Sequence, residues 1–167
     1  LPDSQAAAIR RFWDDMKGLG KPSFVSEYGG HYVANPPEVL RRDLHTGLWS
    51  GFMTPLGTTP LFWWWNFVHE EDLYPEYRAL AAFARGEDRR GRGLEAADPA
   101  VSCPNAWVEA CALAGPDRAY VWVYDAASAL RVPYGERTVS GATVTLAGPA
   151  PGRYEVEFWD TRAGKVA

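Results

Sequence analysis

Several features that mark whole classes of protein are scarce or missing in this 167-residue chain. No run approaches the roughly 20 apolar residues that a membrane-spanning helix requires, and the first residues lack the basic-then-apolar order of a signal peptide. The two cysteines, Cys103 and Cys111, have no histidine or second cysteine pair nearby at the spacing of a zinc site. We therefore expect no membrane span, no metal and no cofactor, while a disulfide is allowed but not required.

Positive charge is also limited, because 17 basic residues face 21 acidic ones and the net charge is −4. A phosphate backbone selects a broad positive field, so nucleic acid is not an expected partner. The arginine-rich residues 85–93 are interrupted by glycines and partly neutralised by Glu87 and Asp88. This stretch predicts a solvated linker, with a polyanion-binding patch as the alternative.

Aromatic residues, by contrast, are plentiful, with eight Trp, eight Tyr and seven Phe. Such a content suits either a crowded core or a surface on which flat, weakly polar rings such as sugars stack. A chain of this length buries roughly two thirds of its unfolded surface. We therefore expect a stable core without a disulfide or metal.

The first part of the chain alternates between helical and strand patterns. Apolar residues at helical spacing predict helices over residues 5–17, from Asn35 to before Gly57, and over residues 73–85. Short apolar runs predict buried strands over residues 23–27 and 60–64. A strand, a helix and a strand in this order form a right-handed crossover between parallel strands. Because both faces of a parallel sheet must be covered, we expect this part to belong to a larger α/β unit.

The rest of the chain carries the pattern of short strands. These strands are predicted over residues 106–113, 119–124, 143–146 and 154–159. A turn at residues 115–117 makes the first two a hairpin, and together the strands suit a small antiparallel β-sandwich. We thus expect an α/β part over residues 1–85, a linker over 86–98 and an incomplete sandwich over 99–167.

One carboxylate, Glu27, stands at the end of a predicted strand. In a (β/α) barrel the reactive groups lie at the C-terminal ends of the strands. Gly29 and Gly30 remove side chains from the following loop, which lets a ligand approach closely. Catalytic carboxylates generally work in pairs, and only one is visible here. A surface carboxylate that merely ends a strand is therefore the alternative.

Trp63, Trp64, Trp65 and Asn66 end the second predicted strand. Alternation sends Trp64 and Asn66 to one side of the strand and Trp63 and Trp65 to the other, so at least one indole belongs to the core. Another is expected to lie beside Glu27 and to offer its face to a sugar ring. Core packing of all three is the alternative.

Two histidines follow these strand ends, and we expect both to line the same mouth. His31 comes after the Glu27 loop, and His69 comes after the tryptophans. The acidic residues 70–72 beside His69 suit a solvated loop better than a site. His45, inside a predicted helix, is expected to have no role.

Residues 21–30, KPSFVSEYGG, resemble the seventh-strand motif of the clan A retaining glycoside hydrolases, in which a strand ends in the catalytic Glu. The match extends along the chain. Segments similar to the following helix, eighth strand and last helix of cellulase-like bacterial members close to family 5 are residues 44–53, 57–58, 63–65 and 73–83. Residues 139–143 and 151–161 resemble the β-sandwich appended to such barrels.

The resemblance implies the last βα units of a (β/α)8 TIM barrel followed by a small antiparallel β-sandwich. It implies a hydrolase that cleaves β-glycosidic bonds in poly- or oligosaccharides through a glycosyl-enzyme intermediate on Glu27. The residues expected to bind the carbohydrate substrate are Tyr28, His31, Trp64, Trp65, Asn66 and His69. A secreted or extracytoplasmic location is favoured.

The chain departs from the clan in one respect. The acid/base Glu, which the clan places after Asn at the end of the fourth strand, has no counterpart here, and a whole barrel needs about 250 residues. We therefore expect a fragment that is inactive alone, with the missing N-terminal barrel portion as its partner.

Two other roles remain open for the β-rich part. It forms either a brace docked on the barrel, which we favour, or a non-catalytic carbohydrate- or matrix-binding module. Exposed aromatic side chains would favour the module, and the candidates are Trp107, Trp122, Tyr134 and Trp159.

Overall fold

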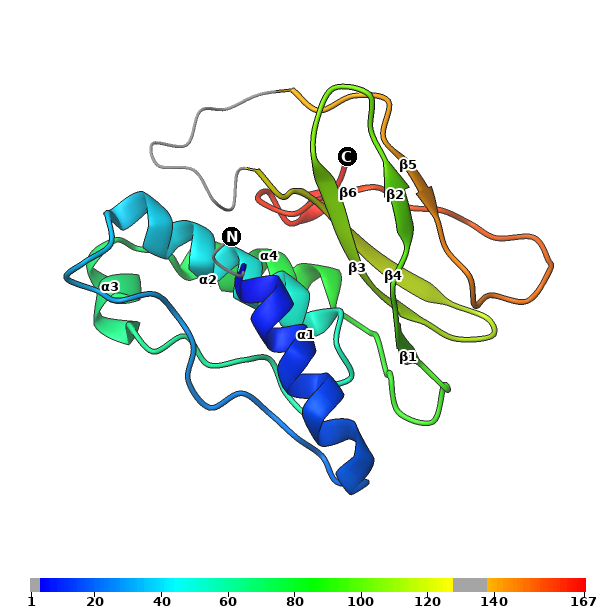
Figure 1. The fold of residues 1–167 in the computed structure, drawn as a ribbon, viewed down its shortest axis with the longest axis horizontal. Coiled ribbons are helices and arrows are strands. Elements are labelled where there is room, and N and C mark those ends of the chain that lie inside the picture. Colours follow the sequence, from blue (N-terminus) through cyan, green and yellow to red (C-terminus); the bar gives the residue numbers. More distant parts are fainter. Residues whose placement is uncertain (1–3, 128–137) are drawn as a thin grey trace.

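A computed structural model describes residues 4–127 and 138–167 and places the helices on one side of the molecule and the sheets on the other (Figure 1). The helices are α1 (Gln5–Met16), α2 (Pro37–Phe52), α3 (Trp65–Glu70) and α4 (Tyr74–Phe83), with a 3-10 turn, η1 (Lys17–Leu19), after α1. The strands are β1 (Glu95–Ala97), β2 (Ala100–Ser102), β3 (Val108–Ala114), β4 (Ala119–Asp125), β5 (Thr143–Thr145), β6 (Trp159–Asp160) and β7 (Lys165–Val166).

The three long helices lie where the sequence predicts them and begin with the expected residues. The Ser4 side chain accepts a hydrogen bond from the Ala7 amide at 3.2 Å and caps α1. Prolines stand in the first turns of α2 and α4, where their missing N–H groups have no helical partner to lose. Helix α3 was not expected, since a strand end and a loop were predicted over these residues.

The two apolar segments, residues 23–28 and 60–63, lie side by side and parallel, as predicted. Their pairing is too short to form a regular sheet, and Tyr28 and Phe62 make a single parallel bridge. The hydrogen bonds run from the Tyr28 amide to Leu61 O (3.0 Å), from the Trp63 amide to Tyr28 O (2.9 Å) and from the Leu61 amide to Val25 O (3.1 Å). The segments before and after α2 therefore run parallel, but the buried strands predicted over residues 23–27 and 60–64 do not form: neither segment is a regular strand, Phe24 and Leu61 are exposed, and the described residues form no closed barrel.

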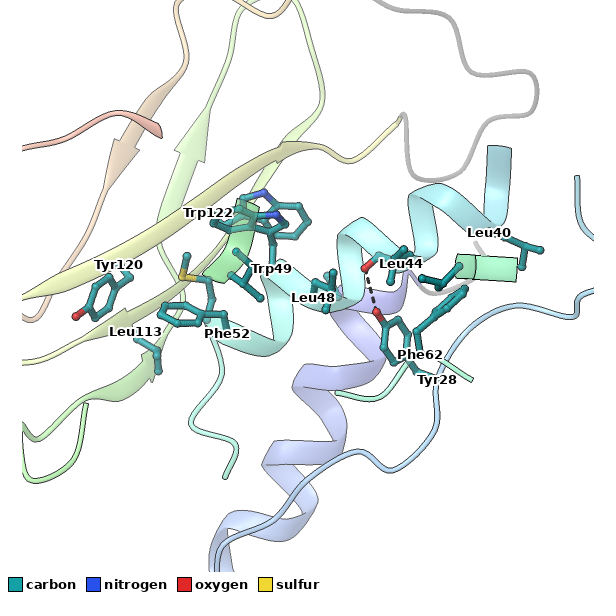
Figure 2. Packing of buried hydrophobic residues seen from close by; sticks show 14 of the residues in the cluster. Tyr28, Leu40, Leu44, Leu48, Trp49, Phe52, Phe62, Leu113, Tyr120 and Trp122 are labelled. Carbon is teal, nitrogen blue, oxygen red and sulfur yellow. Dashed lines mark hydrogen bonds between the residues drawn. The ribbon is translucent and has the colours of Figure 1, made fainter. Parts of the chain in front are cut away.

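Helix α2 is the centre of the hydrophobic core (Figure 2). One end of the helix packs against Tyr28 and Phe62, and the other packs against residues of β3 and β4 (Figure 2). The Tyr28 hydroxyl donates a hydrogen bond to Leu44 O at 2.9 Å. Gly47 permits this approach, since a Cβ there would lie 2.0 Å from the Tyr28 ring, and Gly51 similarly admits the Pro60 ring.

Changing Gly47 to Ala tests this contact. In an unhindered helix interior the change would stabilise the protein by up to about 1 kcal/mol. Here the added methyl group displaces Tyr28 and breaks its hydrogen bond, so we expect a net loss of about 2 kcal/mol in the free energy of unfolding. Urea denaturation measures it. Gly18→Ala is the control, because a Cβ at Gly18 meets nothing within 4 Å. Stability equal to that of the wild type in Gly47→Ala would contradict this packing.

The β-rich part contains the predicted hairpin. Strands β3 and β4 pair antiparallel, and β1 adds to β3 to give the order β1-β3-β4. The pairs β2–β5 and β6–β7 form two further antiparallel sheets.

The strand predicted over residues 154–159 is largely absent, since only Trp159 belongs to a strand. Val156 and Phe158 are exposed. Alternation shows that a segment suits a half-buried strand, but in the described residues this segment has no partner strand.

The charged stretch after α4 is docked rather than fully solvated. The Arg89 guanidinium lies 4.5 Å from the centre of the Phe52 ring and donates to Phe52 O at 2.7 Å. The Glu87 carboxylate accepts hydrogen bonds from Tyr120 and Arg118 of the β-rich part. Strand β1 also lies within the predicted linker over residues 86–98.

A buried histidine joins the helices to the C-terminal hairpin. His45 Nδ1 lies 2.6 Å from the Glu76 carboxylate, and its Nε2 lies 3.3 Å from the Thr161 hydroxyl. Arg162 donates to the other oxygen of Glu76. Burial lowers the pKa of His45, so a neutral ring that donates from Nδ1 and accepts at Nε2 satisfies both partners. His45, expected to be a packed or exposed helix residue without a functional role, is packed and links three elements.

Candidate functional site

Glu27 lies at the end of the first extended segment with its side chain exposed. Since Tyr28 bridges Phe62, Glu27 is beside Leu61 in the parallel register. Tyr28 and Phe62 are buried against α2, and successive side chains of an extended chain alternate in direction. Glu27 and Leu61 therefore face away from α2. Within residues 4–127 and 138–167 the Glu27 carboxylate has no hydrogen bond or ion pair.

The predicted alternation is seen over residues 61–64, whereas Trp65 and Asn66 belong to α3 instead of a strand. Phe62 is 1% exposed and Trp64 is half-buried, whereas Trp63 is 47% and Trp65 73% exposed. We name Glu27, Leu61 and Trp63 the Glu27 face, because alternation puts all three on the side opposite α2. Trp63 was not among the expected binding residues. It is two residues from Leu61, which pairs with Glu27, whereas Trp65 is four residues away.

Trp64 and Tyr28 take structural positions instead of open ones. The Trp64 indole N–H donates to Gly30 O, and its ring centre lies 5.1 Å from that of Tyr32. The Tyr28 hydroxyl is committed to Leu44 O. Neither side chain presents its polar atom to a ligand in this structure. Trp64 instead holds the backbone of the loop after Glu27, and Tyr28 ties the residue next to Glu27 to α2.

The remaining predicted binding residues do not gather at one mouth. His31 is exposed, and its Nδ1 accepts from the Ala34 amide at 3.2 Å within the turn that leads to α2. Asn66 is half-buried in α3. His69, also on α3, lies with its Nδ1 3.1 Å from the Tyr74 hydroxyl.

Trp65 and His69 line an open groove of about 530 Å³ between the second extended segment and α4. The other residues of its wall are Leu61, Phe62, Val68, Tyr74 and Tyr77. Leu61 belongs both to this groove and to the Glu27 face. The groove therefore adjoins the Glu27 face through Leu61, and His31 is not among the residues that line it.

Asp43, which lies on α2 beside the loop after Glu27, was not predicted from the sequence. Its carboxylate lies against Gly30, and the Gly30 N–H and the Gln5 side chain favour its charged form by hydrogen bonding. Burial raises the pKa of Asp43 to about 6, although the charge of Arg42 and these hydrogen bonds oppose the rise. The only sequence signal is the position of an acid within the apolar stripe that contains Leu40 and Leu44.

The described part of the chain offers no group of three or more His, Cys, Asp or Glu side chains arranged to hold a metal ion. None of its helices combines the length and the apolar character needed to cross a membrane. Cys103 and Cys111 are free thiols, and burial raises the pKa of Cys111 to about 11.

Comparisons with protein-family models, with curated proteins and with solved structures found no match for this chain. The likeness to clan A glycoside hydrolases therefore depends on the sequence motifs alone.

Asp43 predicts a pH dependence of stability. Its pKa is about 6 in the folded chain, against an ordinary value of 3.8, so the folded state holds this proton more tightly. The resulting stabilisation is complete below about pH 4 and is lost as the pH rises through 6. Between pH 4.5 and 7.5 we expect the wild type to lose on the order of 1 kcal/mol of unfolding free energy relative to Asp43→Asn, after allowance for partial exposure.

Urea denaturation at the two pH values measures this difference. Asp15→Asn removes an exposed aspartate from α1 and should follow the wild type. Identical pH dependence in the wild type and Asp43→Asn would show that Asp43 titrates as an ordinary carboxyl.

Proposed function

We propose that this chain is the C-terminal part of a retaining glycoside hydrolase that cleaves β-glycosidic bonds in poly- or oligosaccharides. Glu27 is its nucleophile. The observation that carries the proposal is the position of Glu27, exposed at the end of one of two parallel extended segments, on the same face as Trp63. Reactive groups at the carboxyl ends of parallel strands are the arrangement that (β/α) barrels use.

The chemistry needs a carboxylate that is free to attack carbon. In a retaining reaction the nucleophile displaces the leaving sugar at the anomeric carbon and forms a glycosyl ester, while a carboxylic acid about 5–5.5 Å away protonates the departing oxygen. Water, deprotonated by that second residue, then cleaves the ester. Glu27 suits the first role because no group in the described part of the chain engages its oxygens. The acid/base residue comes from outside this chain.

The edges of the parallel pair support the need for a further segment. The N–H and C=O of Leu61 and the N–H of Trp63 are directed toward the first extended segment, so the peptide groups of Phe62 between them point the other way. Phe24 and Leu61 are each 58% exposed. Parallel pairs are normally covered on both faces. We assign the covering role to the N-terminal portion of the barrel, which is also the source of the acid/base Glu.

Exposed indoles supply the sugar platform. Trp65 keeps the role expected of it, because its ring is open and borders the groove. Trp63 joins it, since it shares the face of Glu27. An indole face covers the apolar side of a pyranose ring, and His69 lies at the rim to bond a hydroxyl.

The exposed Tyr154 and Phe158 would suit a binding module, but the candidate tryptophans give that alternative little support. Trp122 is buried and stacks on Tyr124 with 4.5 Å between ring centres, and Trp159 packs against Phe83 at 5.3 Å. Trp107 is exposed, and Tyr134 lies outside the described residues. The inward aromatics favour the brace role for the β-rich part.

The isolated 167-residue chain should not hydrolyse glycosides. Without a general acid, a factor of about 10² to 10⁴ in rate is lost, and most of the binding cleft is absent as well. An assay with activated aryl glycosides should give the same rate for the wild type and Glu27→Gln. Turnover by the chain alone that depends on Glu27 would overturn the assignment of the acid to another segment.

In the enzyme that includes the acid-supplying segment, a 2-fluoro glycoside of the correct sugar should label Glu27. The fluorine slows hydrolysis of the ester, so the covalent adduct is found by mass spectrometry of peptides. Glu27→Gln should remove both the label and turnover, while the control Glu70→Gln keeps them. A label on one of the acidic residues 70–72 would show that the nucleophile is wrongly assigned.

A further inference from the structure

The peptide groups of Gly30 are held from two sides. The Asp43 carboxylate of α2 lies directly against Gly30, and the Gly30 N–H favours its charged form. The Gly30 carbonyl accepts from the Trp64 indole N–H, which comes from the end of the second extended segment. Gly30 follows Glu27 by three residues and begins the loop to α2. Two elements that are distant in the sequence therefore grip the same point of this loop.

The loop leaves no space for another arrangement. A Cβ at Gly30 would lie 2.6 Å from the Asn35 amide nitrogen and 2.9 Å from the Asp43 carboxylate. Gly29 has a φ of +129°, and a Cβ there would lie 2.9 Å from the Phe62 ring. Gly29 requires glycine for its φ, and at Gly30 the backbone lies directly against the Asn35 and Asp43 side chains.

Glu27 lies between residues whose backbone is held. Before it, Val25 O accepts from the Leu61 N–H at 3.1 Å, and after it the Tyr28 backbone is hydrogen-bonded to Leu61 and Trp63. Beyond Tyr28, the hold on Gly30 fixes the path of the chain away from the strand end. A misplacement of about 1 Å at a reacting group can cost a factor of about 10² in rate. This loop therefore controls the direction of the Glu27 side chain.

The surroundings of Asp43 make its charge important. Gln5 of α1 donates to the carboxylate, Arg42 of α2 supplies a positive charge, and the buried Tyr28 hydroxyl lies close enough to interact electrostatically. A carboxylate accepts a stronger hydrogen bond from a peptide N–H than a neutral amide oxygen does. Ionisation of Asp43 at this half-buried position lowers the free energy of unfolding. The same ionisation strengthens the hold on Gly30.

We propose that Asp43 and Trp64 are positioning residues that grip the Gly30 peptide from both sides and thereby set the direction of Glu27 toward the sugar. The catalytic meaning of this grip rests on the proposed function of Glu27. The grip itself is a property of the loop. Trp64 thus serves the site through the backbone rather than as a sugar platform.

Amide NMR spectra and hydrogen exchange of the full 167-residue chain between pH 5 and 8 test the proposal. In the wild type the Gly30 amide resonance should shift with a midpoint near pH 6. In Asp43→Asn this titration should vanish, and the Gly30 amide should exchange about tenfold faster or more, because a hydrogen bond to a charged group is replaced by a neutral one. Trp64→Phe keeps an aromatic ring against Tyr32 but lacks the N–H, and it should speed exchange at Gly30 and His31.

Asp15→Asn and Trp65→Phe are the matched controls, since each makes the same chemical change at an exposed position. Equal exchange at Gly30 in the variants and their controls, or a Gly30 titration that survives in Asp43→Asn, would overturn the proposal. If Asp43→Asn fails to fold, the wild-type titration and Trp64→Phe decide by the same criteria.

A second measurement separates this proposal from the proposed function. In the enzyme with the acid-supplying segment, Trp64→Phe should lower kcat at least tenfold with little change in KM, because the nucleophile is misdirected while the sugar still binds. An unchanged kcat would overturn the positioning role. Faster exchange at Gly30 together with no 2-fluoro glycoside label on Glu27 would instead refute the proposed function and leave the grip on Gly30 standing.

Discussion

The close approach of α2 to the two extended segments is the contact on which the rest of the structure depends. Gly47 and Gly51 leave room for the rings of Tyr28 and Pro60, and the Tyr28 hydroxyl binds the helix backbone. Because this contact turns Tyr28 and Phe62 inward, their neighbours must turn outward. The exposure of Glu27 is therefore a consequence of how a helix packs on the segment that carries it.

The same helix connects the site to the β-rich part. Its C-terminal half packs against Tyr120 and Trp122, and His45 on it joins Glu76 to the C-terminal hairpin (Figure 2). The aromatic side chains of the β-rich part that contact the core face the helices, where they exclude water from this joint. This arrangement suits a brace that holds α2 in place, and α2 in turn holds Asp43 beside Gly30.

The exposed apolar surface and the half-buried carboxylate are both unfavourable for an isolated small protein. Phe24, Leu61 and Trp65 lose the stabilisation that burial would provide, and Asp43 is ionised at neutral pH where water is scarce. Both costs are explained if another segment covers the apolar surface and the Asp43 carboxylate holds the loop at Gly30. Features that oppose stability locally are typical of functional sites.

The sequence by itself determined the local elements and the two faces of the second segment. Helical spacing places α1, α2 and α4, and period-two alternation separates Trp63 from Phe62 and Trp64, because such signals act between near neighbours in the chain. It also predicted that the two extended segments lie side by side and parallel, since the crossover rule restricts their arrangement.

Only the tertiary structure decided which side chains meet across the fold. The grip of Asp43 and Trp64 on Gly30 and the bonds of His45 to Glu76 and Thr161 join residues that are 13 to 116 positions apart. No local pattern specifies such pairs, because a hydrogen bond depends on a fit of a few tenths of an ångström that packing alone sets. For the same reason the strand predicted over residues 154–159 did not form: alternation provides a face, but a strand also needs a partner.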